Sequence, residues 1–201
     1  MTRIIAGQAR GRRLAAPAGS ATRPTSDRAR EGLYSTVTAI RGGLEGVPVL
    51  DLYAGSGAVG LEALSRGSTD VLLVESDPRA ARVIAANIAA VGLPGARLVT
   101  APVERVLARG PEEGTRPREF VFADPPYAVS DADLRLMLGS LAARGWLAAG
   151  ALVAIERATR SGEPTWPVGY ERDRSRRYGE ATVWYGLAAG VQPAAISPTG
   201  E

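Results

Sequence analysis

The sequence of 201 residues predicts an α/β fold, in which a mostly parallel sheet is covered by helices on both faces. Apolar strand patterns alternate with helix patterns from residue 47 onward, which is typical of parallel strands joined by crossover helices. These strands are apolar along nearly their whole length, as expected for strands that are buried on both faces. Two further strand patterns close the chain with no helix between them, which indicates an antiparallel edge.

The N-terminal extension, residues 1–46, is expected to form a β-hairpin and a helix. Two short strand patterns flank a glycine-containing turn, at residues 3–6 and 12–15. Thr25 or Ser26 is placed to cap the helix that follows, and this helix is expected to run to about Ile40.

The core, residues 47–188, carries the alternation of strands and helices. Strand patterns lie at residues 47–53, 71–75, 97–101, 120–123, 151–156, 170–176 and 181–187. Helix patterns lie at residues 58–65, 78–91, 103–108 and 131–143. Asp77 and Pro78 predict a helix start, because Asp is a favoured N-cap and Pro a favoured first helical residue. The remaining tail, residues 189–201, is rich in Pro, Gly and Ala and is expected to be loose.

The composition excludes several kinds of catalytic site. All 24 basic residues are Arg, and the chain has no Lys, His or Cys. A Cys/His zinc site, a thiol nucleophile, a Ser-His-Asp triad and a lysine Schiff base are therefore impossible. We expect no metal, and chemistry that needs little acid–base machinery. The sequence has no signal peptide and no apolar run of membrane-spanning length, so a cytoplasmic protein without a membrane partner is expected.

Positive charge is concentrated at the N-terminal end. Residues 1–46 hold eight Arg against three acidic residues, a net charge of +5, whereas residues 47–201 hold 16 Arg against 18 acidic residues, a net charge of −2. A basic segment of this kind favours a polyanionic partner such as nucleic acid.

A glycine-rich turn follows the first strand of the core. Gly55 and Gly57 allow the backbone to approach a ligand closely, and Gly60 allows the next helix to pack against the strand. The following strand ends in Glu75, 20 residues after Gly55, where a carboxylate can accept both hydroxyls of a ribose. The combination predicts a nucleoside site.

The turn and the acid before it, Asp51, together resemble the first motif of class I S-adenosylmethionine (AdoMet) methyltransferases. The resemblance implies that Asp51 and the turn hold the methionine part of AdoMet and that Glu75 holds the ribose, with Ser76 and Asp77 beside the adenine. Many members carry an Asp after the third strand, where this chain has Ala101-Pro102-Val103, so the adenine contact there is left to the backbone. The cofactor-binding residues implied are Asp51, Tyr53, Gly55, Ser56, Gly57, Glu75, Ser76, Pro102, Val103 and Asp124.

The fourth strand is followed by Asp124-Pro125-Pro126-Tyr127, which resembles the catalytic motif of methyltransferases that modify exocyclic or amide nitrogens. The resemblance implies that all four residues are catalytic. The Tyr127 ring would stack on a base drawn out of its helix, while the Asp124 side chain and the Pro125 carbonyl accept the two N–H groups of its amino group. Methyl transfer from a sulfonium depends mainly on positioning and electrostatics, which suits a chain without His, Lys or Cys.

The motif Arg23-Pro-Thr25-Ser-Asp27-Arg28-Ala-Arg30-Glu31 resembles the bacterial 16S rRNA guanine-N2-methyltransferases of the small-subunit type, and the resemblance extends from about residue 3 to residue 187. It implies a Rossmann-like, seven-stranded class I methyltransferase that methylates N2 of a guanine. The implied partner is 16S rRNA in the assembled small ribosomal subunit or a late precursor, and a monomer is expected. The residues expected to bind RNA are Arg10, Arg12, Arg13, Arg23, Thr25, Arg28 and Arg30.

Other interpretations remain open. An adenine-N6 methyltransferase of DNA or RNA shares Asp-Pro-Pro-Tyr, and an NAD-dependent dehydrogenase would account for the glycine-rich turn but not for Asp124. A non-catalytic RNA-binding assembly factor would account for the basic extension. Four arginines near the end, Arg172, Arg174, Arg176 and Arg177, alternate with acidic residues and fit an RNA contact or a salt-bridged edge equally well.

Overall fold

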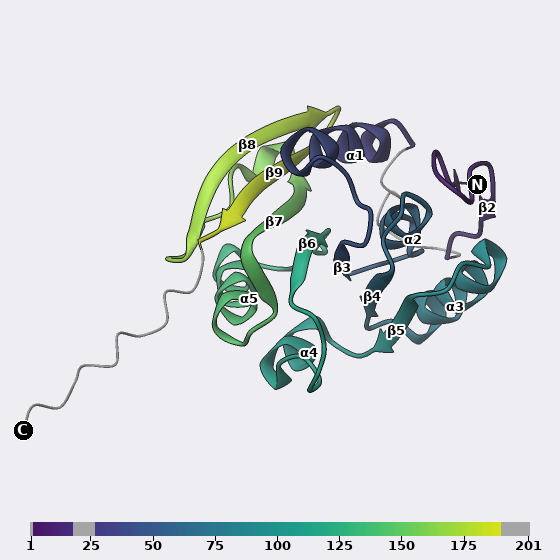
Figure 1. Cartoon of the computed structure of the whole chain (residues 1–201). Coiled ribbons are helices and arrows are strands. Elements are labelled where there is room, and N and C mark those ends of the chain that lie inside the picture. The colour runs from purple at the N-terminus through teal and green to yellow at the C-terminus, as the bar shows by residue number, and fades with distance from the viewer. Residues whose placement is uncertain (1, 18–26, 190–201) are drawn as a thin grey trace, which may run out of the picture.

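A seven-stranded sheet forms the centre of the molecule in the computed structural model, which describes residues 2–17 and 27–189 (Figure 1). Its five parallel strands are β3 (Pro48–Leu52), β4 (Asp70–Glu75), β5 (Ala96–Thr100), β6 (Arg118–Ala123) and β7 (Leu147–Ala158). Two antiparallel strands complete it, β8 (Tyr170–Tyr178) and β9 (Ala181–Ala188). The order across the sheet is β5-β4-β3-β6-β7-β9-β8, so the predicted fold class is confirmed.

Helices cover both faces of the sheet, as the sequence pattern predicted. The helices are α1 (Asp27–Arg41), α2 (Ala58–Ser65), α3 (Pro78–Val91), α4 (Val103–Arg109) and α5 (Asp131–Ala143), with one 3-10 turn at Thr159–Ser161. One apolar cluster lies on each face of the sheet. Val49 of β3 packs in the cluster with α1, α2 and α3, and the next residue, Leu50, packs in the cluster with α4 and α5. None of these helices in the described part of the chain is long and apolar enough to cross a membrane.

The strand order reverses between β3 and β6. The chain passes from β3 outward to β4 and β5 and then returns to the other side of β3 as β6. The carboxyl ends of β3 and β6 therefore border a crevice at a topological switch point, which is where open α/β sheets bind ligands. Asp51 lies near the end of β3 and Asp124 directly follows β6, so both predicted site residues reach this crevice.

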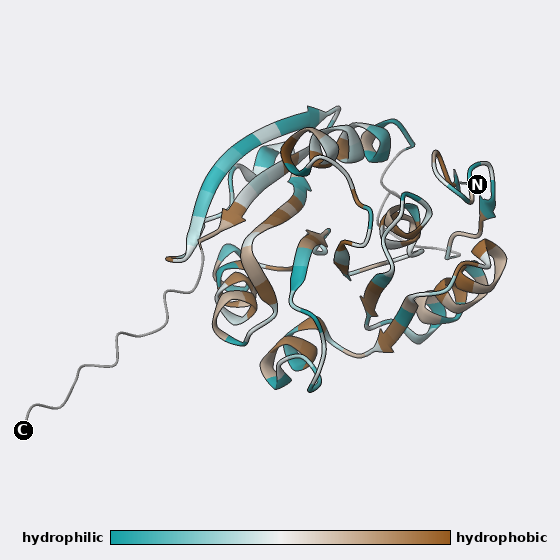
Figure 2. Ribbon diagram, viewed as in Figure 1, coloured by the Kyte–Doolittle hydropathy of each residue, from teal (hydrophilic) through white to brown (hydrophobic). Residues whose placement is uncertain are grey.

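The C-terminal strands extend the sheet beyond the parallel part. β7 is longer than the predicted 151–156 at both ends: Leu147 pairs with Arg118 of β6, and Arg157 and Ala158 pair with β9 alone. β8 is the outer edge and is hydrophilic along most of its length (Figure 2). Charged side chains on an exposed edge strand discourage pairing with other chains.

The N-terminal hairpin is shorter than predicted. Its strands are β1 (Thr2–Arg3) and β2 (Arg13–Leu14), instead of residues 3–6 and 12–15. Beyond β1 the backbone makes hydrogen bonds to α2 in place of strand pairing, because the N–H groups of Ile5 and Ala6 donate to the carboxylate of Glu62 at 2.7 and 2.9 Å. Ile4 and Leu14 are each only 1% exposed and join the apolar cluster of α1, α2 and α3. The described part of the extension is thus packed into the core.

Candidate active site

The glycine-rich turn joins β3 to α2 at the crevice. Gly57 begins α2 with a φ of 75°, a left-handed conformation that favours glycine. A Cβ on Gly57 would lie 3.0 Å from Leu73 Cδ2, and one on Gly60 would lie 3.0 Å from Asp51 Oδ2. The structure therefore supports the packing role that the sequence suggested for Gly60.

Asp51 is a buried carboxylate just before this turn. Its side chain is 1% exposed and its Oδ2 accepts a hydrogen bond from the Gly60 N–H at 2.8 Å. Burial, opposed by the hydrogen bond from the Gly60 N–H and assisted by the nearby Glu75 carboxylate, raises the pKa of Asp51 to about 8. A carboxylate in such a position is stabilised by a positive charge brought close to it.

Glu75, at the end of β4, fixes the turn against the sheet. Its Oε2 accepts the N–H of Gly55 at 2.8 Å, and its Oε1 accepts the N–H of Asp77 at 2.9 Å. Each carboxylate oxygen has a second lone pair, so hydroxyl groups can be accepted in addition. Ser76 and Asp77 are exposed at the rim, where the sequence analysis expects the adenine.

Tyr53 and the start of α4 border the same region. Tyr53 has a φ of 57°, and no other described residue apart from glycine has a positive φ. Such strain concentrates at ligand-binding turns. Its hydroxyl lies 3.2 Å from a carboxylate oxygen of Glu104 in α4. Pro102 is exposed, but the Val103 side chain is buried in the core, which leaves only its backbone for a cofactor.

Asn87 of α3 is a site residue that the sequence analysis missed. Its amide accepts the N–H of Ala15 at 2.8 Å and donates to the carbonyl oxygens of Ala15 and Ser56, at 3.0 and 2.8 Å. The side chain, 2% exposed, thereby joins the N-terminal extension to the glycine-rich turn. The sequence could have indicated this residue, because Asn87 is a polar side chain on the same helix face as the apolar Ile84 and Val91.

Asp124 lies between the glycine-rich turn and a cavity on its other side. Burial, together with the neighbouring carboxylates of Glu156 and Asp51, raises the pKa of Asp124 to about 8. The parallel pairing of Ala123 with Ile155 sets the next residues, Asp124 and Glu156, side by side at the ends of β6 and β7. Three predicted site residues, Asp51, Glu75 and Asp124, are thus brought to one edge of the sheet.

This cavity has a volume of about 660 Å³. It lies between the Asp-Pro-Pro-Tyr loop, the start of α1, the end of β7 and the turn from β8 to β9, and its lining includes Arg28, Asp124, Tyr127, Glu156, Arg177 and Tyr178. The Tyr127 side chain is 72% exposed, so its ring is open to a stacking partner. The Arg160 guanidinium lies 5.6 Å from the ring centroid and holds it by a cation–π contact.

The arginines expected to bind RNA fall into three groups. Arg10 and Arg12 are exposed on the hairpin turn, Arg13 is exposed at the start of β2, and Arg28 is exposed at the cavity. Arg23 and Thr25, and the predicted helix cap at Thr25 or Ser26, lie outside the described residues, as does most of the predicted tail.

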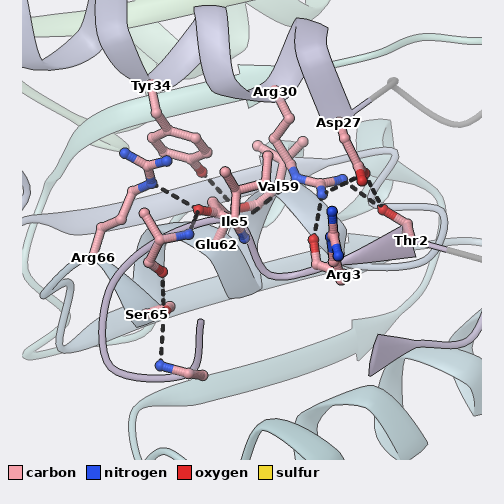
Figure 3. A network of polar contacts seen from close by, with 12 residues as sticks. Thr2, Arg3, Ile5, Asp27, Arg30, Tyr34, Val59, Glu62, Ser65 and Arg66 are labelled. Carbon is pink, nitrogen blue, oxygen red and sulfur yellow. Dashed lines mark hydrogen bonds and ion pairs between the residues drawn. The ribbon is translucent and has the colours of Figure 1, made fainter. Parts of the chain in front are cut away.

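The expectation for Arg30 was wrong. Its side chain is 0% exposed, and its guanidinium donates to the Arg3 carbonyl at 2.6 Å and pairs with Asp27 at 3.0 Å (Figure 3). A second carboxylate, that of the fully buried Glu62, lies 3.7 Å away. A guanidinium enclosed in this network cannot reach a phosphate, so Arg30 holds the extension to the core.

The C-terminal arginines are divided between the two roles left open. Arg172 pairs with Glu163 at 2.7 Å and Arg174 with Asp173 at 2.5 Å, which accounts for them as parts of a salt-bridged edge. Arg177 donates to the Gly179 carbonyl at 2.9 Å and lines the cavity beside Arg28. Its position favours contact with whatever enters the cavity.

Known proteins resemble this chain over most of its length. The family model described as conserved hypothetical protein 95 matches residues 2–186. Ribosomal RNA small subunit methyltransferase D of Escherichia coli (strain K12) is 36% identical over 178 residues, which are 89% of this chain and 85% of that protein. The solved structure of the Escherichia coli protein yhhF has a TM-score of 0.78 and 32% identity, covering 93% of this chain and 97% of that one. A hypothetical protein of Thermus thermophilus has a TM-score of 0.74 and 35% identity, covering 95% and 100%.

Proposed function

Because this chain belongs to the family of conserved hypothetical protein 95 and of the small-subunit ribosomal RNA methyltransferases D, we propose that it transfers the methyl group of AdoMet to the exocyclic N2 of one guanine in 16S rRNA. The chain is an AdoMet-dependent methyltransferase of 16S rRNA, and the choice of guanine N2 is the finer part of the proposal. One observation carries it: Asp124 stands between a turn built for a nucleoside cofactor and a cavity with an exposed stacking ring.

The turn region fits AdoMet on the cofactor side. Gly55 leaves room for a ligand against the backbone, since a Cβ there would meet nothing nearer than the Tyr53 carbonyl oxygen at 3.9 Å, and Glu75 offers carboxylate oxygens to ribose hydroxyls. Bound AdoMet supplies a methyl group on a positively charged sulfur. Burial raises the pKa values of the Asp51 and Asp124 carboxyls, and a positive sulfur placed beside them would favour their ionised forms, which provide the negative charge that such a cation requires.

The cavity fits a base that has been drawn out of its helix. Tyr127 stacks on the ring, which orients the base without reading its identity. Asp124 and the Pro125 carbonyl accept the two N–H groups of the amino group, which turns the nitrogen lone pair toward the methyl carbon. The new C–N bond forms as the C–S bond breaks, and the proton then left on the nitrogen passes to Asp124 or to solvent.

The basic surface fits the RNA that carries this base. Arg28 and Arg177 line the cavity, and Arg10, Arg12 and Arg13 are exposed on the N-terminal hairpin. Guanidinium groups bind phosphates without regard to sequence, so they hold the RNA while the cavity selects the base. We propose that the substrate is the assembled small subunit or a late precursor, in which folded rRNA presents one guanine to this surface.

The proposal is tested by nucleoside mass spectrometry of 16S rRNA from a strain that lacks this protein. Small subunits from that strain should lack one N2-methylguanosine and should regain it when incubated with the purified protein and AdoMet. Asp124→Ala should lower the rate of methyl transfer by about 100-fold or more, because the side-chain acceptor that holds one N–H of the reacting amino group is lost. Recovery of N6-methyladenosine alone would favour the adenine alternative, and subunit binding without methyl transfer would favour the assembly factor.

A further inference from the structure

Glu156 is a carboxylate of the cavity wall that the transfer itself does not use. It lies near the end of β7, is 8% exposed, and lines the cavity together with Asp124 and Tyr127. Because Ala123 pairs with Ile155, Glu156 and Asp124 lie side by side at the ends of adjacent strands. The cavity therefore presents two neighbouring carboxylates to one edge of any base stacked on Tyr127.

The hydrogen-bonding edges of the purines differ at the atom beside the amino group. Guanine carries a donor there, N1–H, next to the amino group on C2, so both groups can donate to acceptors on the same side. Adenine carries an unprotonated N1 beside its amino group, so a carboxylate facing it meets a lone pair. An ionised carboxylate can accept hydrogen bonds but cannot donate one, which makes a pair of them suited to guanine and unfavourable to adenine.

We propose that Glu156 accepts the N1–H of the target guanine and is the residue that makes this site select guanine over adenine. The inference rests on the proposed function, since it names the part of the cavity that reads the base while Asp124 holds its amino group. Glu156 already interacts with neighbouring groups in the free chain. Its two oxygens can keep one such contact and still accept one N–H.

Charge in the cavity supports this assignment. The carboxylates of Glu156 and Asp124 repel each other, and this repulsion adds to burial in raising the pKa of Asp124. Two N–H donors of guanine relieve that repulsion, whereas the lone pair of adenine adds to it. A site whose buried polar groups are satisfied by one substrate and left unpaired by its analogue discriminates by far more than a shape difference does.

The test compares guanine with 2-aminopurine at the target position of reconstituted small subunits. 2-Aminopurine keeps the amino group on C2 but lacks both the N1–H and O6. The wild type should prefer guanine by about 100-fold in kcat/KM, the size expected when a charge-assisted hydrogen bond to a buried group is lost. Glu156→Gln, whose amide can donate to an unprotonated N1, should show a preference of about fivefold or less.

Comparison within the same set of variants separates the possible causes. Loss of O6 affects both enzymes alike, so the change in preference isolates N1. Glu156→Asp, which keeps the carboxylate, should retain the preference for guanine, and Glu113→Gln, an exposed residue at the opposite edge of the sheet, should behave as the wild type. Melting temperatures of all variants identify any loss of folding.

The outcomes for the two proposals differ. If Glu156→Gln prefers guanine as strongly as the wild type does, Glu156 does not read N1 and the inference is wrong. If the wild type forms no N2-methylguanosine on guanine-containing subunits, the proposed function itself fails, whatever the variants do. A preference that collapses in Glu156→Gln and survives in Glu156→Asp supports the inference.

Discussion

Replacing Arg30 by Met should destabilise the protein without touching its RNA-binding surface. The side chain is 0% exposed and loses its contacts to the Arg3 carbonyl at 2.6 Å and to Asp27 at 3.0 Å. Removing one partner of a buried ion pair costs about 3–5 kcal/mol. The lower end applies here, since Glu62 keeps a second guanidinium, that of Arg66, at 2.8 Å. A loss of about 3 kcal/mol corresponds to a melting temperature lowered by roughly 6–12 °C in a chain of this size.

The measurement pairs thermal and urea unfolding with binding to small subunits, and Arg28→Met is the matched control. Arg28 lies two residues earlier but is exposed at the cavity, so its removal should change stability by less than about 0.5 kcal/mol while weakening RNA binding. Affinity of Arg30→Met should equal that of the wild type at temperatures where both are folded. An Arg30→Met protein with an unchanged melting temperature and a weakened affinity for subunits would refute the structural assignment of this residue.

Three further changes should have measurable effects. Because the pKa values of Asp51 and Asp124 are about 8 when folded and near 4 when unfolded, the free energy of unfolding of the cofactor-free protein should fall as pH rises from about 4 to about 8. AdoMet binding at pH 7 should then release protons, and a calorimetric heat that is the same in buffers of different ionisation enthalpy would contradict this. Tyr127→Ala should lower kcat/KM by about 10- to 100-fold and Tyr127→Phe by less than about threefold, because stacking requires only the ring; equal losses in single-turnover assays would assign the effect to the hydroxyl. Asn87→Ala should weaken AdoMet binding by about tenfold, because three hydrogen bonds that include one to Ser56 are lost; an unchanged Kd would show that the link does not hold the turn.

The core could be predicted from the sequence because each of its elements has its own periodicity. The helix starting at Pro78 has its predicted cap, since the Asp77 side chain accepts the Arg79 N–H at 2.9 Å. The N-terminal hairpin could not be predicted in the same way. The N–H groups of Ile5 and Ala6 donate to Glu62, which lies more than 50 residues further along the chain, and no local sequence pattern predicts a partner at that separation.

The assignment of Arg30 shows where the sequence held more information than the prediction used. Residues 30, 33, 34 and 37 lie on one face of a helix, and Leu33, Tyr34 and Val37 are its apolar stripe. The helical phase therefore places Arg30 on the buried side and Arg28 on the exposed side. Charge composition alone treats the two arginines as equal.

The candidate site divides in a similar manner. Asp51, Glu75 and Asp124 belong to sequence motifs, and the structure places them together at the carboxyl edge of the sheet. Glu156 belongs to no motif. Its position beside Asp124 depends on the register between β6 and β7, which apolar strands buried on both faces do not reveal.

The attachment of the extension to α2 has a consequence for the order in which the chain matures on the ribosome. The extension and α1 are synthesised first, but Glu62 emerges later, and β8 and β9 later still. A Cβ on Gly32 of α1 would lie 2.4 Å from the ring of Tyr178 in β8, and Val183 and Tyr185 of β9 belong to the same apolar cluster as α1. The segment made first is therefore among the last to be covered. Nascent chains that stop before β9 would leave Leu33 and Val37 incompletely covered, and chaperones and proteases recognise such surfaces.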